Sequence, residues 1–315
     1  MIIAETMGKI VILLIALTLD LILSEPPNTW HPVAWLGKLI SLETKLAPQR
    51  GKFRQMAYGA GIVLVTLGLI VTAVYFLFAQ LSEFNLIVYV IISGLLLKFS
   101  FSLRGLRQAV DSVKRLLSKD NLGQARLSLR SLVSRDTTEL SQSQVISAAV
   151  ESAAENICDS FVAPLFYFSI FGVPGAIAYR VINTYDTMIG YRGRWEYVGK
   201  FAARLDDVAN FIPARVTALL IVLAALICRK NISQAWHIMI RDHNKTESPN
   251  AGWTMSAVAG ALDVQLEKAG HYKLGDNHLP LSLNTIDASR QIIVVTAIMW
   301  CSILMLAEVI YFVAA

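Results

Sequence analysis

The sequence has little charge and little cysteine. Asp, Glu, Lys and Arg together make up only 16% of its 315 residues, whereas 55% are hydrophobic. This balance is too apolar for a soluble domain of that length and indicates a membrane protein. Only three cysteines are present, Cys158, Cys228 and Cys301, and their wide spacing fits neither a disulfide framework nor a zinc site. We expect them to be buried, reduced thiols.

Several familiar motifs are also absent. The chain has no Walker lysine loop, no glycine-rich dinucleotide turn, no Gly-x-Ser-x-Gly elbow and no His-Glu-x-x-His pair. The formal net charge of +5 is spread through the loops without a basic block. We therefore expect no nucleic-acid partner, and a basic membrane face instead.

Long apolar segments are the most abundant feature. Six of them are long enough to cross or nearly cross a bilayer: 10–24, 56–82, 86–97, 161–179, 216–228 and 291–307. The predicted fold class is therefore all-α, a polytopic membrane protein with about four to six membrane helices. Pro164 and Pro174-Gly175 interrupt segment 161–179, so we expect some helices to be broken or re-entrant.

The loops predict orientation. Residues 25–55 hold five bases against two acids, whereas 83–85 hold no base, so the first loop is expected in the cytoplasm and the second outside. We treat 1–315 as one membrane-embedded domain, with a cytoplasmic helical subdomain over 98–160. Within it, Asp120-Asn121 is expected to begin one helix, and Asp136 or Thr137 to cap the next.

Region 148–216 concentrates polar residues and is the expected active-site region, because ionisable groups are costly beside a bilayer. Glu151, Glu155 and Asp159 are spaced i, i+4, i+8, which makes one acidic stripe on a continuous helix, with Asn156 alongside. The simple alternative is a solvated acidic face. Carboxylate and amide oxygens are the ligands that magnesium prefers, and the stripe runs directly into an apolar segment.

Two further polar groups follow. Arg180 and Asn183 share one helical face, with Asp186 beside them and Gly190-Tyr191 closing the helix. Arg204 and Asp207 are i, i+3 neighbours, and Asp206 and Asn210 are i, i+4, just before Arg215. Local ion pairing is the alternative for these spacings, and it would contribute only tenths of a kcal/mol.

Two loops beside the apolar segments hold isolated polar residues. In the proline-rich loop 25–32, Asn28 and His31 are expected near the membrane interface; a lone histidine is more often packed than a ligand. Asn250 lies in a turn before small residues that allow close helix packing. Asp20 has two interpretations, a side chain that reaches water or a member of the site.

Five collinear blocks carry a resemblance: LDLILSEPPNTWHPVAWLGKLIS, VESAAENICDSFVAPLFYF, AYRVINTYDTMIGYR, AARLDDVANFIPAR and SPNAGWTMSAVAGAL. Together they resemble the cobinamide-phosphate synthase family of cobalamin biosynthesis. That resemblance implies a multi-pass enzyme of the cell membrane, with its active site facing the cytoplasm. The implied reaction is ATP-dependent amide ligation of adenosylcobyric acid with aminopropanol or its phosphate.

The resemblance also implies roles for the polar residues, because such a ligation needs magnesium, ATP, cations and a base. Acid-base work is assigned to Glu151, Glu155, Asp186 and Asp207. Metal binding is assigned to Asp159, Asn156, Asn183, Asp206 and Asn210. Substrate binding is assigned to Arg180, Arg204, Arg215, His31, Asn250 and Tyr191. The lipid bilayer is a further partner, and a second copy or other membrane enzymes of the pathway are alternatives.

One difficulty is topological. If 161–179 and 216–228 both crossed fully, 180–215 would lie outside, away from 151–159 and from ATP. We therefore predict that these segments do not simply cross. Two other functions stay open from the sequence: a non-catalytic membrane sensor or regulator, resembling a branch linked to β-lactamase induction, and a corrinoid carrier or transporter.

Overall fold

The structure is a computed structural model, and it describes residues 2–23, 26–27, 29–191, 193 and 195–314, with side chains from residue 8 onward. Glu25 and Asn28 of the proline-rich loop lie outside the described residues. Contacts group the chain into two compact units. Unit 1 comprises 1–102, 163–209 and 304–315, and unit 2 comprises 103–162 and 210–303.

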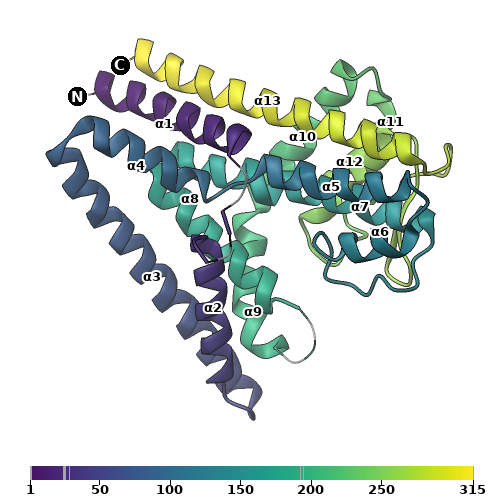
Figure 1. Cartoon of the computed structure of the whole chain (residues 1–315), viewed down its shortest axis with the longest axis horizontal. Coiled ribbons are helices and arrows are strands. Elements are labelled where there is room, and N and C mark those ends of the chain that lie inside the picture. Colours follow the sequence, from purple (N-terminus) through teal and green to yellow (C-terminus); the bar gives the residue numbers. More distant parts are fainter. Residues whose placement is uncertain (1, 24–25, 28, 192, 194, 315) are drawn as a thin grey trace. The chain divides into compact units, whose positions relative to one another are not determined.

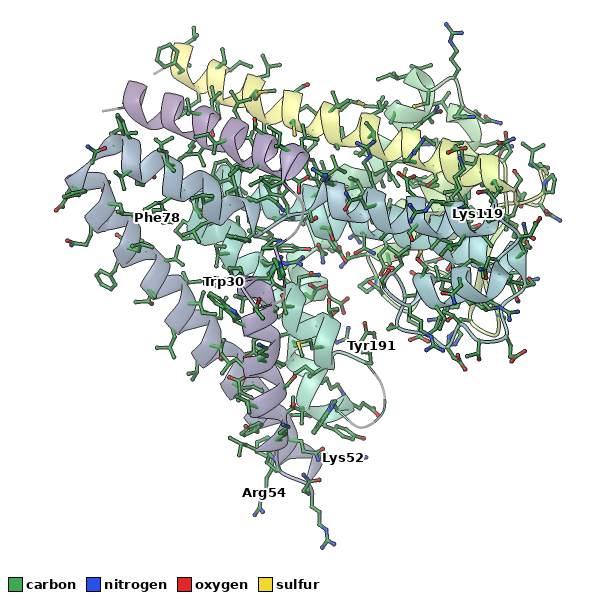
Figure 2. All side chains as sticks on the ribbon, in the orientation of Figure 1. Trp30, Lys52, Arg54, Phe78, Lys119 and Tyr191 are labelled. Carbon is green, nitrogen blue, oxygen red and sulfur yellow. The ribbon has the colours of Figure 1, made fainter. Side chains whose placement is uncertain are left out.

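Unit 1 is built from helices, several of them long and apolar (Figure 1). They are α1 (Ile2–Ile22), α2 (Pro32–Lys45), α3 (Lys52–Phe84), α4 (Leu86–Lys98), α8 (Ala163–Ile189), α9 (Glu196–Ala209) and the end of α13 (Leu283–Ala314). Asn85 ends α3 and caps α4 by accepting hydrogen bonds from the amides of Ile87 and Val88. The turn predicted at 83–85 is confirmed. Lys52 and Arg54 extend from the first turn of α3 (Figure 2).

Close helix contacts in unit 1 depend on glycine. A Cβ at Gly59 of α3 would collide with the carbonyl oxygen of Val198 in α9, and one at Gly199 would collide with that of Ile189. Buried apolar residues of α2, α3, α8 and α9 form the adjoining core, with Ile40 and Tyr185 fully enclosed. Glycine here removes the side chain that would hold these backbones apart.

Unit 2 contains shorter helices and a small hairpin. Its elements are α5 (Leu103–Leu117), α6 (Leu122–Leu129), α7 (Gln142–Ile157), a π-helical turn (Cys158–Val162), α10 (Phe211–Ile227), α11 (Ile232–Asp242), α12 (Ala251–Ala261), β1 (Leu266–Lys268), β2 (Tyr272–Leu274) and the first part of α13. The strands pair antiparallel, with Lys268 opposite Tyr272. The sequence analysis did not predict this hairpin, nor the helices α2 and α11.

Helix termini in unit 2 test two predictions. Asn121 caps α6 by accepting a hydrogen bond from the Gln124 amide, so the predicted start is confirmed. The predicted cap at Asp136 or Thr137 is wrong, because Ser141 and Gln144 form a capping box at the start of α7. Close packing of α12 is confirmed: a Cβ at Gly260 would collide with the backbone of α11.

Four helical stretches are long and apolar enough to cross a membrane, and a fifth is added if α9 and α10 count as one bent span. The four are Lys52–Phe84, Leu86–Leu117, Gln142–Ile189 and Leu283–Ala314. The predicted all-α, polytopic fold with four to six membrane helices is confirmed. Predicted segments 10–24 and 216–228 fall in α1 and α10, while 86–97 and 161–179 are parts of longer stretches.

The irregular backbone predicted in 161–179 is confirmed at two points. The π-helical turn precedes α8, and within α8 Gly172 adopts φ 66° and ψ −160°, two residues before Pro174. Only glycine reaches that conformation without strain, and proline cannot donate its backbone hydrogen bond. The helix is therefore interrupted where the sequence places Gly and Pro.

Candidate functional site

The structure distributes the predicted site residues over both units. Unit 1 holds His31, Arg180, Asn183, Asp186, Tyr191, Arg204, Asp206 and Asp207. Unit 2 holds Glu151, Glu155, Asn156, Asp159, Asn210, Arg215 and Asn250. We describe the clusters within each unit separately, and the prediction that they share one pocket stays a prediction.

Glu151 is the best-defined carboxylate of unit 2. It is only 4% exposed, and three side chains approach it, one from its own helix, one from the preceding loop and one from the hairpin. The Ser147 hydroxyl donates to Oε1 at 2.6 Å, and the Tyr272 hydroxyl donates to Oε2 at 2.9 Å. Arg135 lies 3.4 Å from Oε2. We call these four residues the Glu151 cluster; its three donors hold the carboxylate in one orientation.

Local contacts hold the partners of Glu151 in place. The loop that carries Arg135 is fixed because the Ser152 hydroxyl donates to the Leu132 carbonyl at 2.8 Å. The hairpin that carries Tyr272 is attached to α7, since the Glu267 amide donates to the Ser147 hydroxyl oxygen at 2.8 Å. Burial and the neighbouring Glu151 charge raise the pKa of Tyr272, so this phenol stays a donor.

The acidic stripe is not continuous. Glu151 and Glu155 lie on α7, but α7 ends at Ile157 and Asp159 falls in the π-helical turn. A π-turn holds more residues than an α-turn, so Asp159 is rotated out of the predicted row. A base from outside the helix, Arg135, pairs with Glu151. The α-helical row that the spacing predicted therefore ends before Asp159.

A second cluster of unit 2 centres on Arg215 of α10. Its guanidinium donates to Asn250 Oδ1 at 2.6 Å and to the Phe211 carbonyl at 2.8 Å. The same group lies over the Phe211 ring at 3.8 Å and near the Trp253 ring at 5.0 Å. This is the planar, stacked environment that favours arginine over lysine. Arg215 and Asn250, both predicted to bind substrate, are thus brought together.

Asn210 lies at the break between α9 and α10 and is 2% exposed. Its Oδ1 is 3.9 Å from the Cys158 sulfur. Cys158 and Cys301 are buried free thiols, as expected, whereas Cys228 is partly exposed.

In unit 1, two of the predicted metal ligands meet. Asn183 of α8 donates to Asp206 Oδ1 of α9 at 3.3 Å, and both side chains are buried. Arg204 and Asp207 form the exposed local pair at 3.5 Å that the alternative interpretation described. With 75% of its side chain exposed, Arg204 contributes little to stability there.

The remaining predicted residues make only local contacts or are exposed. His31 caps α2, because its Nδ1 accepts a hydrogen bond from the Val33 amide at 3.2 Å. Tyr191 is 50% exposed beyond the end of α8. Asp186 lies against Gly190, where a Cβ would collide with its carboxylate.

Three polar contacts escaped the sequence analysis. Asp20, expected to reach water or join the site, instead forms a buried ion pair with Lys98 at 3.1 Å. The Glu43 carboxylate accepts from Tyr185 at 2.6 Å and from Thr66 at 2.9 Å. Asp242, fully buried, joins α11 to the hairpin. The partners of Glu43 lie 23 and 142 residues away in sequence, so no local spacing signals them, whereas Asp242 also pairs with its neighbours Arg241 and Lys245.

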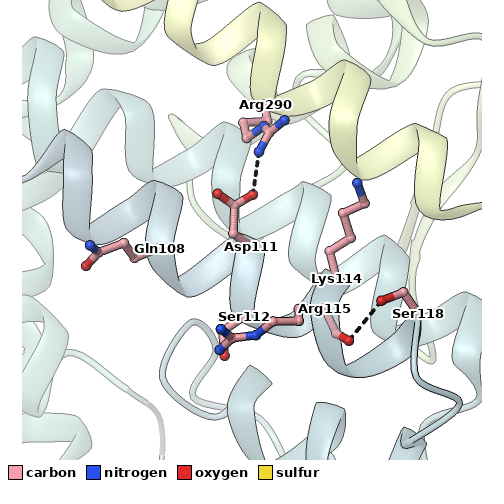
Figure 3. Close-up of a pocket in the computed structure, with 7 residues that line it drawn as sticks. All are labelled: Gln108, Asp111, Ser112, Lys114, Arg115, Ser118 and Arg290. Atoms are coloured by element: carbon pink, nitrogen blue, oxygen red, sulfur yellow. Dashed lines mark hydrogen bonds and ion pairs between the residues drawn. The ribbon is translucent and has the colours of Figure 1, made fainter.

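A groove in unit 2 lies beside α5 and α13, with a volume of about 700 Å³ (Figure 3). Its charged lining residues are Asp111, Lys114, Arg115 and Arg290. None of them belongs to the polar region that the sequence analysis singled out.

Comparison with known proteins covers most of the chain. The model of the CobD/Cbib protein family matches residues 13–299. The chain belongs to this family. A cobalamin biosynthesis protein CobD of Dehalococcoides mccartyi is 53% identical over 97% of this chain and 99% of its own length. A probable cobalamin biosynthesis protein CobD of Methanothermobacter thermautotrophicus is 44% identical over 86% and 88%. No solved structure matches.

A metal ion can be tested against this CobD/Cbib chain. Across the described residues, no three His, Cys, Asp or Glu side chains are grouped to hold a metal. Magnesium needs fewer, since it keeps several waters and takes one or two carboxylates plus substrate phosphates. The buried Asn183 and Asp206 pair fits that lesser requirement. The magnesium assignments themselves stay predictions.

Proposed function

We propose that this chain is an adenosylcobinamide-phosphate synthase. It would join a carboxylate of adenosylcobyric acid to the amine of aminopropanol or aminopropanol phosphate, with cleavage of ATP. The observation that carries the proposal is the end-to-end match to relatives named for cobalamin biosynthesis, 53% identical in one case. The resemblance of the five sequence blocks supplies the particular reaction.

The chemistry explains why an apolar protein keeps buried polar groups. Amide formation from a carboxylate in water is uphill, so the carboxylate must first be activated. A carboxylate oxygen would attack the terminal phosphorus of ATP, forming an acyl phosphate and releasing ADP. The amine would then attack the acyl carbon, the C–N bond would form, and inorganic phosphate would leave while the amine loses a proton. Cations and a base are therefore required.

Residues of unit 2 suit two of these tasks. We assign Glu151 to the amine proton, because three donors hold its buried carboxylate in one orientation. We assign Arg215 to a phosphate or carboxylate of the substrates. Stacking on Phe211 fixes the plane of its guanidinium. The hydrogen bond to Asn250 Oδ1 fixes the direction of one guanidinium nitrogen.

Residues of unit 1 suit magnesium. Asp206 and Asn183 would hold it, with Asp186 and Arg180 on the same helix as Asn183. When bound, the ion would neutralise phosphate charge. Its removal by chelation should therefore stop product formation and leave the fold intact.

A single assay tests the proposal. The protein in lipid nanodiscs is incubated with adenosylcobyric acid, aminopropanol phosphate, ATP and magnesium, and the condensed product and ADP are measured by mass spectrometry. We expect equal amounts of both, and none of either without ATP. Binding of the corrinoid without product would favour a carrier, and no binding of either substrate would favour a regulator.

Variants then test the site. Glu151→Gln, Asp186→Ala and Asp207→Ala should each lower turnover, by about 10²-fold or more for Glu151 if it is the base. Glu139→Gln is the matched control, because Glu139 is an exposed acid in the loop beside Arg135. Unchanged melting temperatures would show that the variants fold. Near-normal turnover of Glu151→Gln would remove it from the mechanism.

A further inference from the structure

The groove beside α5 and α13 has a charge pattern that the family resemblance does not explain. Three of its four charged lining residues are cations: Lys114, Arg115 and Arg290. Two of these are already engaged, since Lys114 lies 2.6 Å from Asp287 and Arg290 lies 2.8 Å from Asp111. These ion pairs are partly exposed, with 30% to 40% of each side chain accessible. Such pairs are weak enough to rearrange around a ligand.

Arg115 differs from the other two cations. It is exposed, and its guanidinium makes no hydrogen bond or ion pair to any residue that the structure describes. Figure 3 shows it along α5 beside Ser112, while Lys114 extends toward α13 and Arg290 of α13 faces Asp111. The groove thus offers the five N–H donors of Arg115 at one place. At another place it offers Lys114 and Arg290, each of which is ion-paired with an aspartate.

The chemistry of the lining residues favours some classes of ligand over others. Ser112 and Ser118 add hydroxyls to the charged residues, and the lining includes no large apolar side chain. A corrin ring would find no large apolar side chain to pack against there, whereas phosphate oxygens would find several hydrogen-bond donors. Because the cations lie at two separate places, an extended chain of phosphates fits better than a single one. Asp111 between them suits an anion that carries magnesium, whose bound waters can donate to a carboxylate.

We propose that this groove binds the polyphosphate chain of ATP. The identity of the anion as ATP rests on the proposed ligase function, but the polyphosphate affinity of the groove does not. No nucleotide-binding motif is present in the sequence, so the phosphates must be held by another arrangement, and Arg115 with Lys114 and Arg290 supplies one.

Binding can be measured without turnover. The protein is placed in nanodiscs of zwitterionic lipid, and calorimetry follows titration with magnesium ATP, inorganic tripolyphosphate and orthophosphate. We expect tripolyphosphate and ATP to bind with similar affinity and orthophosphate much more weakly. Arg115→Ala should weaken both polyphosphates about tenfold, and Arg115→Lys by less, because charge is kept but the fork of donors is lost.

The matched control is Lys119→Ala. Lys119 is an exposed cation just beyond α5 and outside the groove lining (Figure 2). The Lys119→Ala substitution removes the same charge as Arg115→Ala. If it lowered the affinity for tripolyphosphate as much as Arg115→Ala does, the binding would be general attraction by a basic surface, and the proposal would be overturned. Wild-type protein that fails to bind tripolyphosphate would also overturn it.

Two further experiments distinguish a failure of the groove proposal from a failure of the proposed function. Nanodiscs that contain phosphatidylglycerol test a lipid headgroup: binding of tripolyphosphate abolished by this lipid and unrelated to Arg115 would assign the groove to the membrane surface and refute our inference. Condensation that proceeds without ATP would refute the proposed function. Loss of tripolyphosphate binding in Arg115→Ala would still support the groove in that case.

Discussion

Asp242 gives the sharpest test of how buried charge is used in this protein. Its side chain is fully buried at the end of α11, where Arg241 donates to both oxygens at 2.7 and 2.9 Å. Lys245 Nζ lies 2.6 Å from Oδ1, and the Gly275 amide donates to Oδ2 at 2.8 Å. Asp242→Asn should therefore loosen the hairpin that carries Tyr272 to Glu151.

The magnitude follows from the pKa. Burial alone would raise the pKa of Asp242, but hydrogen bonds from Arg241, Lys245 and Gly275 lower it from 3.8 to about 2. A depression of that size corresponds to about 2 kcal/mol of stability at neutral pH. Because the folded pKa is the lower one, this stability is present above about pH 4 and is lost as the pH falls toward 2.

Asp242→Asn should cost about 2 to 3 kcal/mol and lower the melting temperature by several degrees. The matched control is Asp276→Asn, because Asp276 accepts from the same Arg241 at 3.0 Å but is 39% exposed. That change should cost less than about 1 kcal/mol. Tryptophan fluorescence during heating in detergent, at pH 7 and pH 3, measures both. Equal destabilisation by the two variants would refute the reasoning.

Two other predictions concern contacts from distant sequence. Tyr272→Phe removes one of the three donors to Glu151, so we expect turnover to fall about tenfold with little change in substrate KM, because the carboxylate loses its orientation; a change in KM alone would make Tyr272 a binding residue. Gly59→Ala should destabilise unit 1 by more than about 2 kcal/mol, because the added methyl meets the Val198 carbonyl. Gly61→Ala, which meets nothing within 4 Å, is its control, and equal melting temperatures for the two variants would contradict the predicted collision.

What the sequence predicted correctly has local causes. The span 56–82 is one long apolar run, and the structure extends it only to Lys52–Phe84. The interruption of 161–179 follows from Gly172 and Pro174, whose backbone limits act on their own neighbours. Helix periodicity was also sufficient to place Glu151 and Glu155 on one helix.

The site was less predictable because its contacts join distant parts of the chain. Tyr272 is 121 residues from Glu151, and Arg135 is 16 residues away in a loop. The hairpin that supplies Tyr272 has strands of three residues, too short for a period-two pattern. The π-helical turn that displaces Asp159 likewise has no signal in the spacing of acids.

Hydrogen-bond capacity separates two kinds of buried acid. A carboxylate offers about four lone-pair sites. Asp242 accepts from two nitrogens of Arg241, from Lys245 and from Gly275, so the protein fills all of them. Glu151 receives three donors from the described residues, which hold its orientation and leave one site for a substrate proton. This difference accounts for Asp242 as a stabilising residue and agrees with the role proposed for Glu151 at the amine proton, although both are buried acids with an arginine partner.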